Sequence, residues 1–138
     1  MTATTAVAEA FFAACETGRG WEACRAYRAP TATFSAQAEP LLQVETLAEY
    51  TDWMKGRMTV LPDGHDELKA FAADSVRKTV VAYAVFHGTH TGSGGPVPAT
   101  GRHTSTGCVD VMQFDADRIV HMTKVWHSGL AMKELGWC

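Results

Sequence analysis

Two patterns of apolar and polar residues divide the chain into a helical first half and a second half of strands. In the first half, apolar residues recur at every third or fourth position between Val7 and Cys15, which predicts a helix that ends near Gly18. The same reasoning, with Thr46 as a helix cap, predicts three further elements. They are a short helix over Trp21–Tyr27, a short strand over Thr31–Gln37 and a third helix over Leu47–Arg57.

In the second half, segments rich in Val, Thr, Phe and Tyr are separated by Gly, Pro and Asp, which is typical of strands and turns. The expected strands are His65–Ala73, Arg77–Thr91, Gly101–Phe114 and Arg118–Ser128, followed by a helical turn over Leu130–Leu135. Helices followed by antiparallel strands predict a single α+β domain over residues 1–138, with the helices on one face of the sheet. Strands this long must twist and bend. A sheet curved around a helix encloses a conical hollow, which favours a small-molecule site.

Composition and charge exclude several classes of partner. The 138 residues include 12 Lys and Arg against 15 Asp and Glu, a net charge of -3, so the chain lacks the basic surface that nucleic acids and acidic membranes require. No apolar run is long enough for a membrane helix. The segment from Met1 to Ala14 has no basic residue and no continuous apolar core, unlike a secretory signal. The four cysteines never form a C-x-x-C pair, and reduced thiols in the cytoplasm are expected.

Side chains alternate across a strand, so the last strand has two faces. One face carries His121, Thr123, Val125 and His127, and the other carries Val120, Met122, Lys124 and Trp126. Neither face is plainly one that water would cover, so we expect one to line the pocket and the other to meet a partner. Because a bare apolar sheet face favours association, we predict a homodimer through Val120, Met122 and Trp126.

Asp110 is the most suggestive acid in the chain. It shares a strand face with Cys108, Met112 and Phe114, and a carboxylate among apolar neighbours is costly unless it is paired or its pKa is raised. A catalytic acid in the pocket and a carboxylate paired with Arg or Lys at the rim of the sheet are equally compatible with this pattern.

The histidine spacing does not predict a metal site. His87 and His90 are three residues apart and point to opposite faces of a strand. His121 and His127 share a face, but six residues at the rise of a strand separate them by roughly 20 Å. We expect no metal and no other cofactor.

Several segments resemble SnoaL-like polyketide cyclases, which share the cone-shaped fold of nuclear transport factor 2. They are Phe86-His-Gly-Thr-His-Thr-Gly92, Gly95-Pro-Val-Pro-Ala-Thr-Gly101, Gly107-Cys-Val-Asp-Val-Met-Gln-Phe114, Asp117-Arg-Ile-Val120 and Lys133-Glu-Leu-Gly136. The resemblance implies a long curved sheet wrapped around N-terminal helices. It also implies chemistry without metal or cofactor, in which a cavity carboxylate removes a proton next to a carbonyl and the resulting enolate closes a ring.

The resemblance also suggests site residues. The acid that the family carries near the end of its last strand aligns with His127, so His127 or Asp110 acts as the base, or the chain has lost cyclase chemistry. The predicted catalytic residues are Asp110, His121 and His127, and the predicted substrate contacts are His90, Tyr50, Trp53, Phe86 and Thr123. The expected function is cyclisation or isomerisation of a hydrophobic carbonyl compound. The alternatives are a module of the same fold that only binds a ligand or a partner, and a dehydratase or hydrolase that uses the same pocket.

Overall fold

The computed structural model describes residues 3–18 and 21–138, so the first two residues of the N-terminal segment considered above lie outside it. The helices are α1 (Ala3–Glu16), α2 (Trp21–Cys24), α3 (Leu47–Val60) and α4 (Ser128–Leu135), with short 3-10 helices at Arg25–Tyr27 and Glu39–Leu41. The strands are β1 (Arg28–Ala36), β2 (His65–Asp74), β3 (Thr79–Thr89), β4 (His103–Asp115) and β5 (Arg118–Trp126). The predicted α+β class is therefore confirmed.

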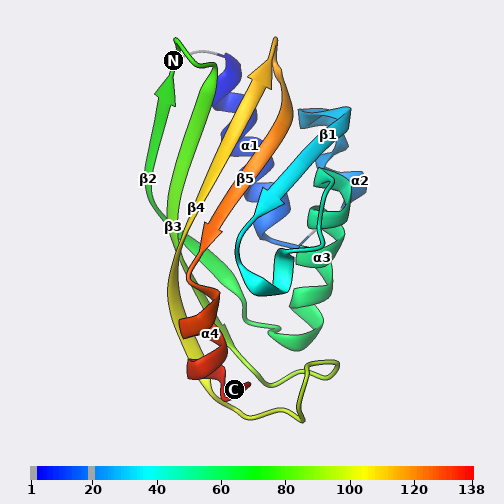
Figure 1. Cartoon of the computed structure of the whole chain (residues 1–138), viewed down its shortest axis with the longest axis vertical. Coiled ribbons are helices and arrows are strands. Elements are labelled where there is room, and N and C mark those ends of the chain that lie inside the picture. The colour runs from blue at the N-terminus through cyan, green and yellow to red at the C-terminus, as the bar shows by residue number, and fades with distance from the viewer. Residues whose placement is uncertain (1–2, 19–20) are drawn as a thin grey trace.

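The five strands form one sheet in the order β1-β5-β4-β3-β2 (Figure 1). Strands β2 to β5 are antiparallel, as predicted, but β1 pairs with β5 in parallel. The expectation of a wholly antiparallel sheet is wrong at this edge. The physical reason is the connection: α3 and three further strands separate β1 from β5 in the chain, so a hairpin does not set their relative direction.

Burial alternates along the two central strands. On β3 and β4 every second residue is buried, and most of the buried apolar ones belong to the same apolar core as residues of α1 and α3. The helices therefore cover one face of the sheet, here called the inner face, and leave the outer face uncovered in the single chain (Figure 1). Inner-face members from the two strands include Ala82, Ala84, Phe86, Cys108, Asp110 and Met112.

Helix α3 is fixed at its start by the predicted cap. The Thr46 hydroxyl accepts a hydrogen bond from the Glu49 backbone N–H, and the Glu49 carboxylate accepts one from the Thr46 N–H, which completes a capping box. The helix buries Tyr50 and Met54 in the core. From about two turns after the cap, α3 also contributes Trp53, Gly56, Arg57 and Val60 to the wall of a cavity.

The two faces of β5 are the reverse of the predicted assignment. Met122 and Lys124 are buried on the inner face, and the Trp126 indole N–H donates to Thr106 Oγ1 at 3.2 Å on the same face. The face that we expected to meet a partner, with Val120, Met122 and Trp126, is thus largely covered by the chain's own core. The predicted dimer surface is wrong, because hydrophobicity alone does not distinguish a face that covers a core from one that meets another chain.

The outer face carries exposed apolar side chains near its centre, among them Tyr83 at 44% and Val125 at 60% exposure. No helix in residues 3–18 and 21–138 is long and apolar enough to cross a membrane. None of the four cysteines, all of which lie within the described residues, is in a disulfide: Cys15, Cys24 and Cys108 are buried and Cys138 is exposed.

Candidate functional site

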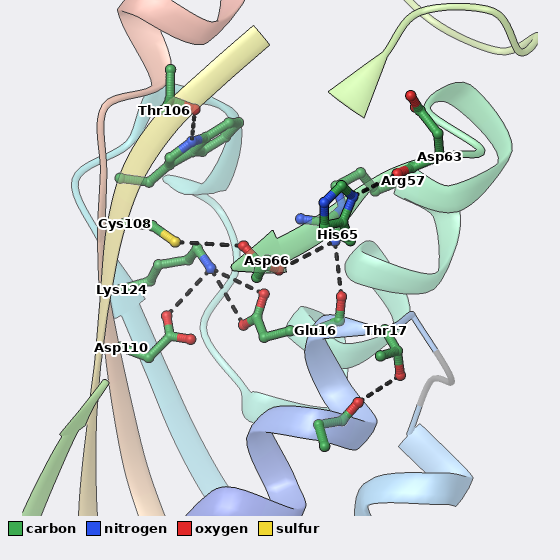
Figure 2. Close-up of polar contacts among 12 residues, drawn as sticks. Glu16, Thr17, Arg57, Asp63, His65, Asp66, Thr106, Cys108, Asp110 and Lys124 are labelled. Atoms are coloured by element: carbon green, nitrogen blue, oxygen red, sulfur yellow. Dashed lines mark hydrogen bonds and ion pairs between the residues drawn. The ribbon is translucent and has the colours of Figure 1, made fainter. Parts of the chain in front are cut away.

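A buried polar cluster lies between the helices and the inner face of the sheet. Lys124 Nζ lies 3.3 Å from Glu16 Oε1, 3.3 Å from Asp110 Oδ1 and 2.8 Å from the Tyr50 hydroxyl oxygen. The Tyr50 hydroxyl in turn donates to Glu16 Oε1 at 2.7 Å. Figure 2 shows the Lys124 ammonium between the two carboxyl groups.

Three parts of the fold bring these groups together. Asp110 and Lys124 are direct partners across β4 and β5, so their side chains leave the same face of the sheet. Glu16 is the last residue of α1, and Tyr50 lies in the first turns of α3, where its ring stacks on Phe34 with centroids 4.4 Å apart. The cluster therefore ties both helices to the sheet.

Burial and neighbouring charges shift the pKa values of Glu16, Asp110 and Lys124 in different directions. Burial raises the pKa of Glu16, but the charges of Lys124 and Arg57 and the hydrogen bonding of neighbouring carboxyl groups together outweigh burial, and the pKa falls to about 2. Burial, followed by the charge of Glu16, raises the pKa of Asp110, although Lys124 opposes the shift. Burial lowers the pKa of Lys124, but Asp110 and Glu16 together raise it well above its usual value. The cluster thus holds a Glu16–Lys124 ion pair beside Asp110, a carboxyl group whose pKa is raised.

A second group of polar side chains lies next to this cluster, around Asp66 of β2. The Cys108 thiol donates to Asp66 Oδ1 at 3.6 Å, and Arg57 Nη2 lies 3.6 Å from Asp66 Oδ2 (Figure 2). The Asp66 side chain is 1% exposed, and Oδ2 has no hydrogen-bond partner. Burial, and then the negative charge of Glu16, raises the pKa of Asp66 to about 7.

Two neighbouring hollows, here together called the inner cavity, lie beside Asp66. The wider one, here called the chamber, has a volume of about 480 Å³. A narrow void of about 10 Å³ next to it is lined by Asp66, Cys108 and Lys124, and Asp66 lines this void and not the chamber. Four residues line both hollows: Trp53, Arg57, Phe86 and Trp126. The rest of the chamber wall is mostly apolar and consists of Pro40, Gly56, Val60, Leu61, Gly94, Gly95, Pro96, Met132, Leu135 and Trp137. An apolar chamber with a titratable carboxyl group in the void next to it is an arrangement suited to acid/base chemistry.

The aromatic rings of the lower wall contact one another edge to face. The Trp126 ring centroid lies 6.2 Å from that of Trp53 and 6.5 Å from that of Phe86. The guanidinium carbon of Arg57 lies 4.2 Å from the centre of the Phe86 ring. These contacts hold the rings and the guanidinium in place around the narrow void.

The structure brings together only some of the predicted site residues. Trp53 and Phe86 line the cavity, as expected, and Tyr50 and Asp110 lie in the polar cluster behind its floor. Asp110 contacts Lys124 and does not line the cavity, which agrees with the alternative of a paired carboxyl group, although in the core and not at the rim.

The other predicted residues lie elsewhere. His121 is on the outer face, where its Nδ1 is 2.6 Å from Thr33 Oγ1 and its Nε2 is 3.0 Å from Ser35 Oγ. Thr123 is beside it, 3.1 Å from the Ser35 hydroxyl. His127 is exposed and caps α4, where its Nδ1 accepts from the Leu130 N–H at 3.4 Å. The three predicted catalytic residues therefore do not form one site: strand parity separates His121 from Asp110, and the sheet ends before His127.

His90 is buried at the far end of the cavity wall. The Trp137 indole N–H donates to His90 Nδ1 at 2.9 Å, so Nδ1 is unprotonated, and Nε2 has no hydrogen-bond partner. His90 is not among the residues that line the cavity, but it supports Trp137 and Gly95, which are. His90, which we predicted to contact the substrate, thus supports the wall of the cavity and does not line it.

A larger hollow of about 820 Å³ lies on the outer face, along the end of β5. Thr123, His127, Tyr83 and Val125 line it together with residues of β1 and β4. It lies over exposed apolar side chains and has no acid among its lining residues. The inner cavity is therefore the better candidate for chemistry, despite its smaller volume.

The sequence interpretation did not identify Asp66, the acid of this site, or its two cations, Arg57 and Lys124. Lys124 had a detectable signal, since a lone charged residue on a face with Met122 and Trp126 needs a buried counter-ion. Asp66 and Glu16 had none, because each lies in a segment where acidic residues normally face water. No group of three or more His, Cys, Asp or Glu side chains in residues 3–18 and 21–138 is arranged to hold a metal ion.

Comparison with protein families gives one match over nearly the whole chain: the model of the SnoaL-like polyketide cyclases matches residues 6–135. A search of curated proteins found no match.

Solved structures share the fold at low sequence identity. IdmH from Streptomyces antibioticus, described as a candidate polyketide cyclase, is 19% identical with a TM-score of 0.75, covering 96% of this chain and 98% of its own. AclR from Streptomyces galilaeus, described as a candidate hydroxylase, is 20% identical with a TM-score of 0.76, covering 96% and 84%. An NTF2-like protein from Burkholderia thailandensis is 18% identical with a TM-score of 0.75, covering 97% and 98%. The cone-shaped fold inferred from the sequence is confirmed, and proteins described with different activities share it.

Proposed function

We propose that this chain, which belongs to the SnoaL-like polyketide cyclase family, uses Asp66 as a general acid/base on a hydrophobic carbonyl compound bound in the inner cavity. The observation that carries the proposal is Asp66 Oδ2, a buried carboxyl oxygen without a hydrogen-bond partner beside the narrow void next to the apolar chamber. A group with a pKa near neutral pH is present in both protonation states, so it can accept a proton and return it.

The proposed reaction balances with one proton. The Asp66 carboxylate removes a proton from the carbon next to a substrate carbonyl, which leaves an enolate. In a cyclisation the enolate carbon forms a bond to a second carbonyl carbon, and the alkoxide produced takes the proton from Asp66. In an isomerisation the same proton returns to a different carbon. Neither course consumes a co-reactant.

The surrounding residues have supporting roles in this proposal. Trp53, Phe86 and Trp126 pack against the apolar part of the substrate and keep water away from the carboxyl group. The negative charge of Glu16, which Lys124 holds in place, helps to keep the pKa of Asp66 high, although Lys124 itself opposes this shift. Asp110, our first choice from the sequence, positions Lys124. We place this activity in the cytoplasm, where cysteines outside disulfides, like the four in this chain, remain reduced.

Exchange of α-protons for deuterium tests proton removal without knowledge of the natural substrate. A suitable probe is 2-tetralone, a bicyclic ketone with activated α-protons, followed by NMR in deuterated buffer. We expect the protein to accelerate exchange, with a rate that rises as pH increases through about 7, since Asp66 must be ionised to accept the proton. Asp66→Asn should reduce the accelerated rate by about a hundredfold or more.

The matched control is Asp117→Asn, which makes the same chemical change at an exposed turn between β4 and β5. It should exchange 2-tetralone like the unaltered protein. If 2-tetralone raises the thermal unfolding temperature but Asp66→Asn leaves the exchange rate unchanged, Asp66 is not the base. Stabilisation by the ketone without any acceleration of exchange would indicate a protein that binds ligands without catalysis.

A further inference from the structure

Arg57 is a buried cation with spare hydrogen-bonding capacity at the cavity floor. Its side chain is 8% exposed, and it lines both the chamber and the narrow void. Its Nη2 donates to the backbone oxygen of Glu16 at 3.0 Å, while its Nε–H is buried without an acceptor. A buried donor left without a partner is costly, and a ligand acceptor removes that cost.

The positive charge of Arg57 is also incompletely balanced. The carboxyl groups near it are those of Asp66 of β2 and Glu16 of α1, and Asp110 of β4 interacts with both of these acids. Glu16 is held by Lys124 and Tyr50, and Asp110 contacts Lys124. Asp66 is the one of these three residues whose carboxyl group contacts Arg57, at 3.6 Å and without hydrogen-bond geometry. The floor of an otherwise apolar chamber thus has a site for a negative charge.

We propose that Arg57 binds an anionic oxygen of the substrate, so that the substrates of this protein carry a carboxylate or an acidic enol next to the reacting carbon. The inference rests on the proposed function, since it assigns the ligand chemistry of the same cavity. The apolar part of the ligand lies against Trp53 and Trp126, and its oxygen reaches the guanidinium, whose place over the Phe86 ring is already fixed. The oxygen then lies beside Asp66, which is the geometry for proton transfer at the adjacent carbon.

Asp66 and the ligand compete for Arg57, which makes binding depend on pH. The groups around Asp66 are Arg57, Glu16, Lys124, Cys108 and Asp110. When Asp66 is protonated, no Asp66 carboxylate competes with the ligand anion for Arg57, and the anion can accept a hydrogen bond from the carboxylic acid of Asp66. When Asp66 is ionised, it repels the anion and attracts Arg57. Anion affinity should therefore fall as pH rises through neutrality, and Asp66→Asn should remove that dependence.

Two matched pairs of probes test the proposal by binding alone. The carboxylate pair is 2-naphthoate and neutral 2-naphthamide, and the enolate pair is 1,3-indanedione and neutral 1-indanone. Quenching of the tryptophan fluorescence reports affinity, because Trp53, Trp126 and Trp137 line the cavity. At pH 6 we expect the anionic member of at least one pair to bind about tenfold or more tightly than its neutral partner, since hydrogen bonds to charged groups are the strong ones.

Substitutions then assign the preference to Arg57. Arg57→Gln should abolish the preference and retain affinity for the neutral probes, and Arg57→Lys should keep part of it. Arg25→Gln makes the same change at an exposed site paired with Glu22 and should behave like the unaltered protein. Thermal unfolding identifies any variant that fails to fold, and the comparison between probes in the unaltered protein needs no variant.

The outcomes distinguish this inference from the proposed function. A preference confined to one pair identifies the anion as a carboxylate or an enolate and supports the proposal in either case. Equal affinity within both pairs overturns the role of Arg57 and leaves proton exchange by Asp66 untouched. A preserved anion preference with unchanged 2-tetralone exchange in Asp66→Asn overturns the proposed base and leaves Arg57 as the anion site.

Discussion

Glu16 and Asp66 are both buried carboxyl groups, yet their pKa values move in opposite directions. Glu16 accepts a hydrogen bond from the Tyr50 hydroxyl and contacts the Lys124 ammonium, and these favour its charged form. Asp66 receives a weak thiol donor and a guanidinium at 3.6 Å, which do not repay the cost of burial. Burial with weak partners, and not its residue type, raises the pKa of Asp66 to about 7.

This difference predicts how stability depends on pH. Because the pKa of Asp66 is raised, the folded chain holds a proton that the unfolded chain loses above about pH 4. The contribution of Asp66 to stability is therefore full below pH 4 and is lost as pH rises towards 7, by a few kcal/mol at most. Asp66→Asn should remove this decline, which urea unfolding at pH 4, 5.5 and 7 measures.

The control for this measurement is again Asp117→Asn at its exposed turn, which should keep the pH profile of the unaltered protein. If Asp66→Asn and the unaltered protein lose stability in parallel between pH 4 and 7, then Asp66 is ionised throughout that range. The proposed acid/base role would lose its electrostatic basis.

The sequence pattern identified Asp110, which lies beside the candidate site, but it did not identify Asp66, the proposed acid/base. Asp110 stood out because a carboxylate alternated with apolar residues on one strand face, and it is indeed buried and paired. Asp66 is the second residue of a strand whose other side chains are half-buried or exposed, so nothing local marks it. Its burial comes from Arg57, Phe86 and Trp126, which approach from three other elements.

At the scale of elements, the loop from His90 to Arg102 is attached to the end of α3. The Gly92 N–H donates to the Val60 oxygen at 3.0 Å, and a Cβ at Gly92 would lie 1.8 Å from the Thr59 oxygen. Such close approach of two backbones requires glycine. The contact places Gly94, Gly95 and Pro96 over the chamber, so one glycine determines the position of a cavity wall.

Gly92→Ala should therefore move the loop away from α3. We expect a loss of stability of roughly 1–3 kcal/mol, as in other overpacked sites, together with weaker binding of 2-naphthamide because the wall is displaced. Chemical denaturation and fluorescence quenching measure the two effects. Gly129→Ala in α4 is the control, since a Cβ there meets nothing within 4 Å. Similar behaviour of the two variants would show that the loop adjusts without cost.

The elements themselves were largely predictable, and their boundaries and pairing were less so. Alternation and three-to-four spacing identified the main helices and all five strands, and Thr46 correctly marked the start of α3. The direction of β1 was not predictable, because local residue patterns do not encode which distant strand it joins. His127 was assigned to a strand, although it caps α4, because a capping histidine has no distinctive pattern.

For the molecule as a whole, the fold explains why both faces of the sheet are apolar. The inner face supplies the core and the cavity, while the outer face carries Tyr83, Val109 and Val125 without a cover in the single chain. The sequence predicted two apolar faces but not which of them meets the helices, since the direction of sheet curvature depends on contacts between distant elements. His121 and Thr123, which we assigned to the pocket, therefore lie on the outer face of the sheet.

We still propose a homodimer, now through the outer face. The centre of this face is uncharged, so the same patch on a second copy can pack against it without repulsion between like charges. Sedimentation at micromolar concentration should show a dimer. Val125→Glu, and independently Tyr83→Glu, should shift it to monomers, because each would bury carboxylates at the centre of the contact. Val76→Glu changes a residue that is 84% exposed at the β2–β3 turn and should remain dimeric. A monomeric unaltered protein, or dimers that survive both substitutions, would overturn this interface.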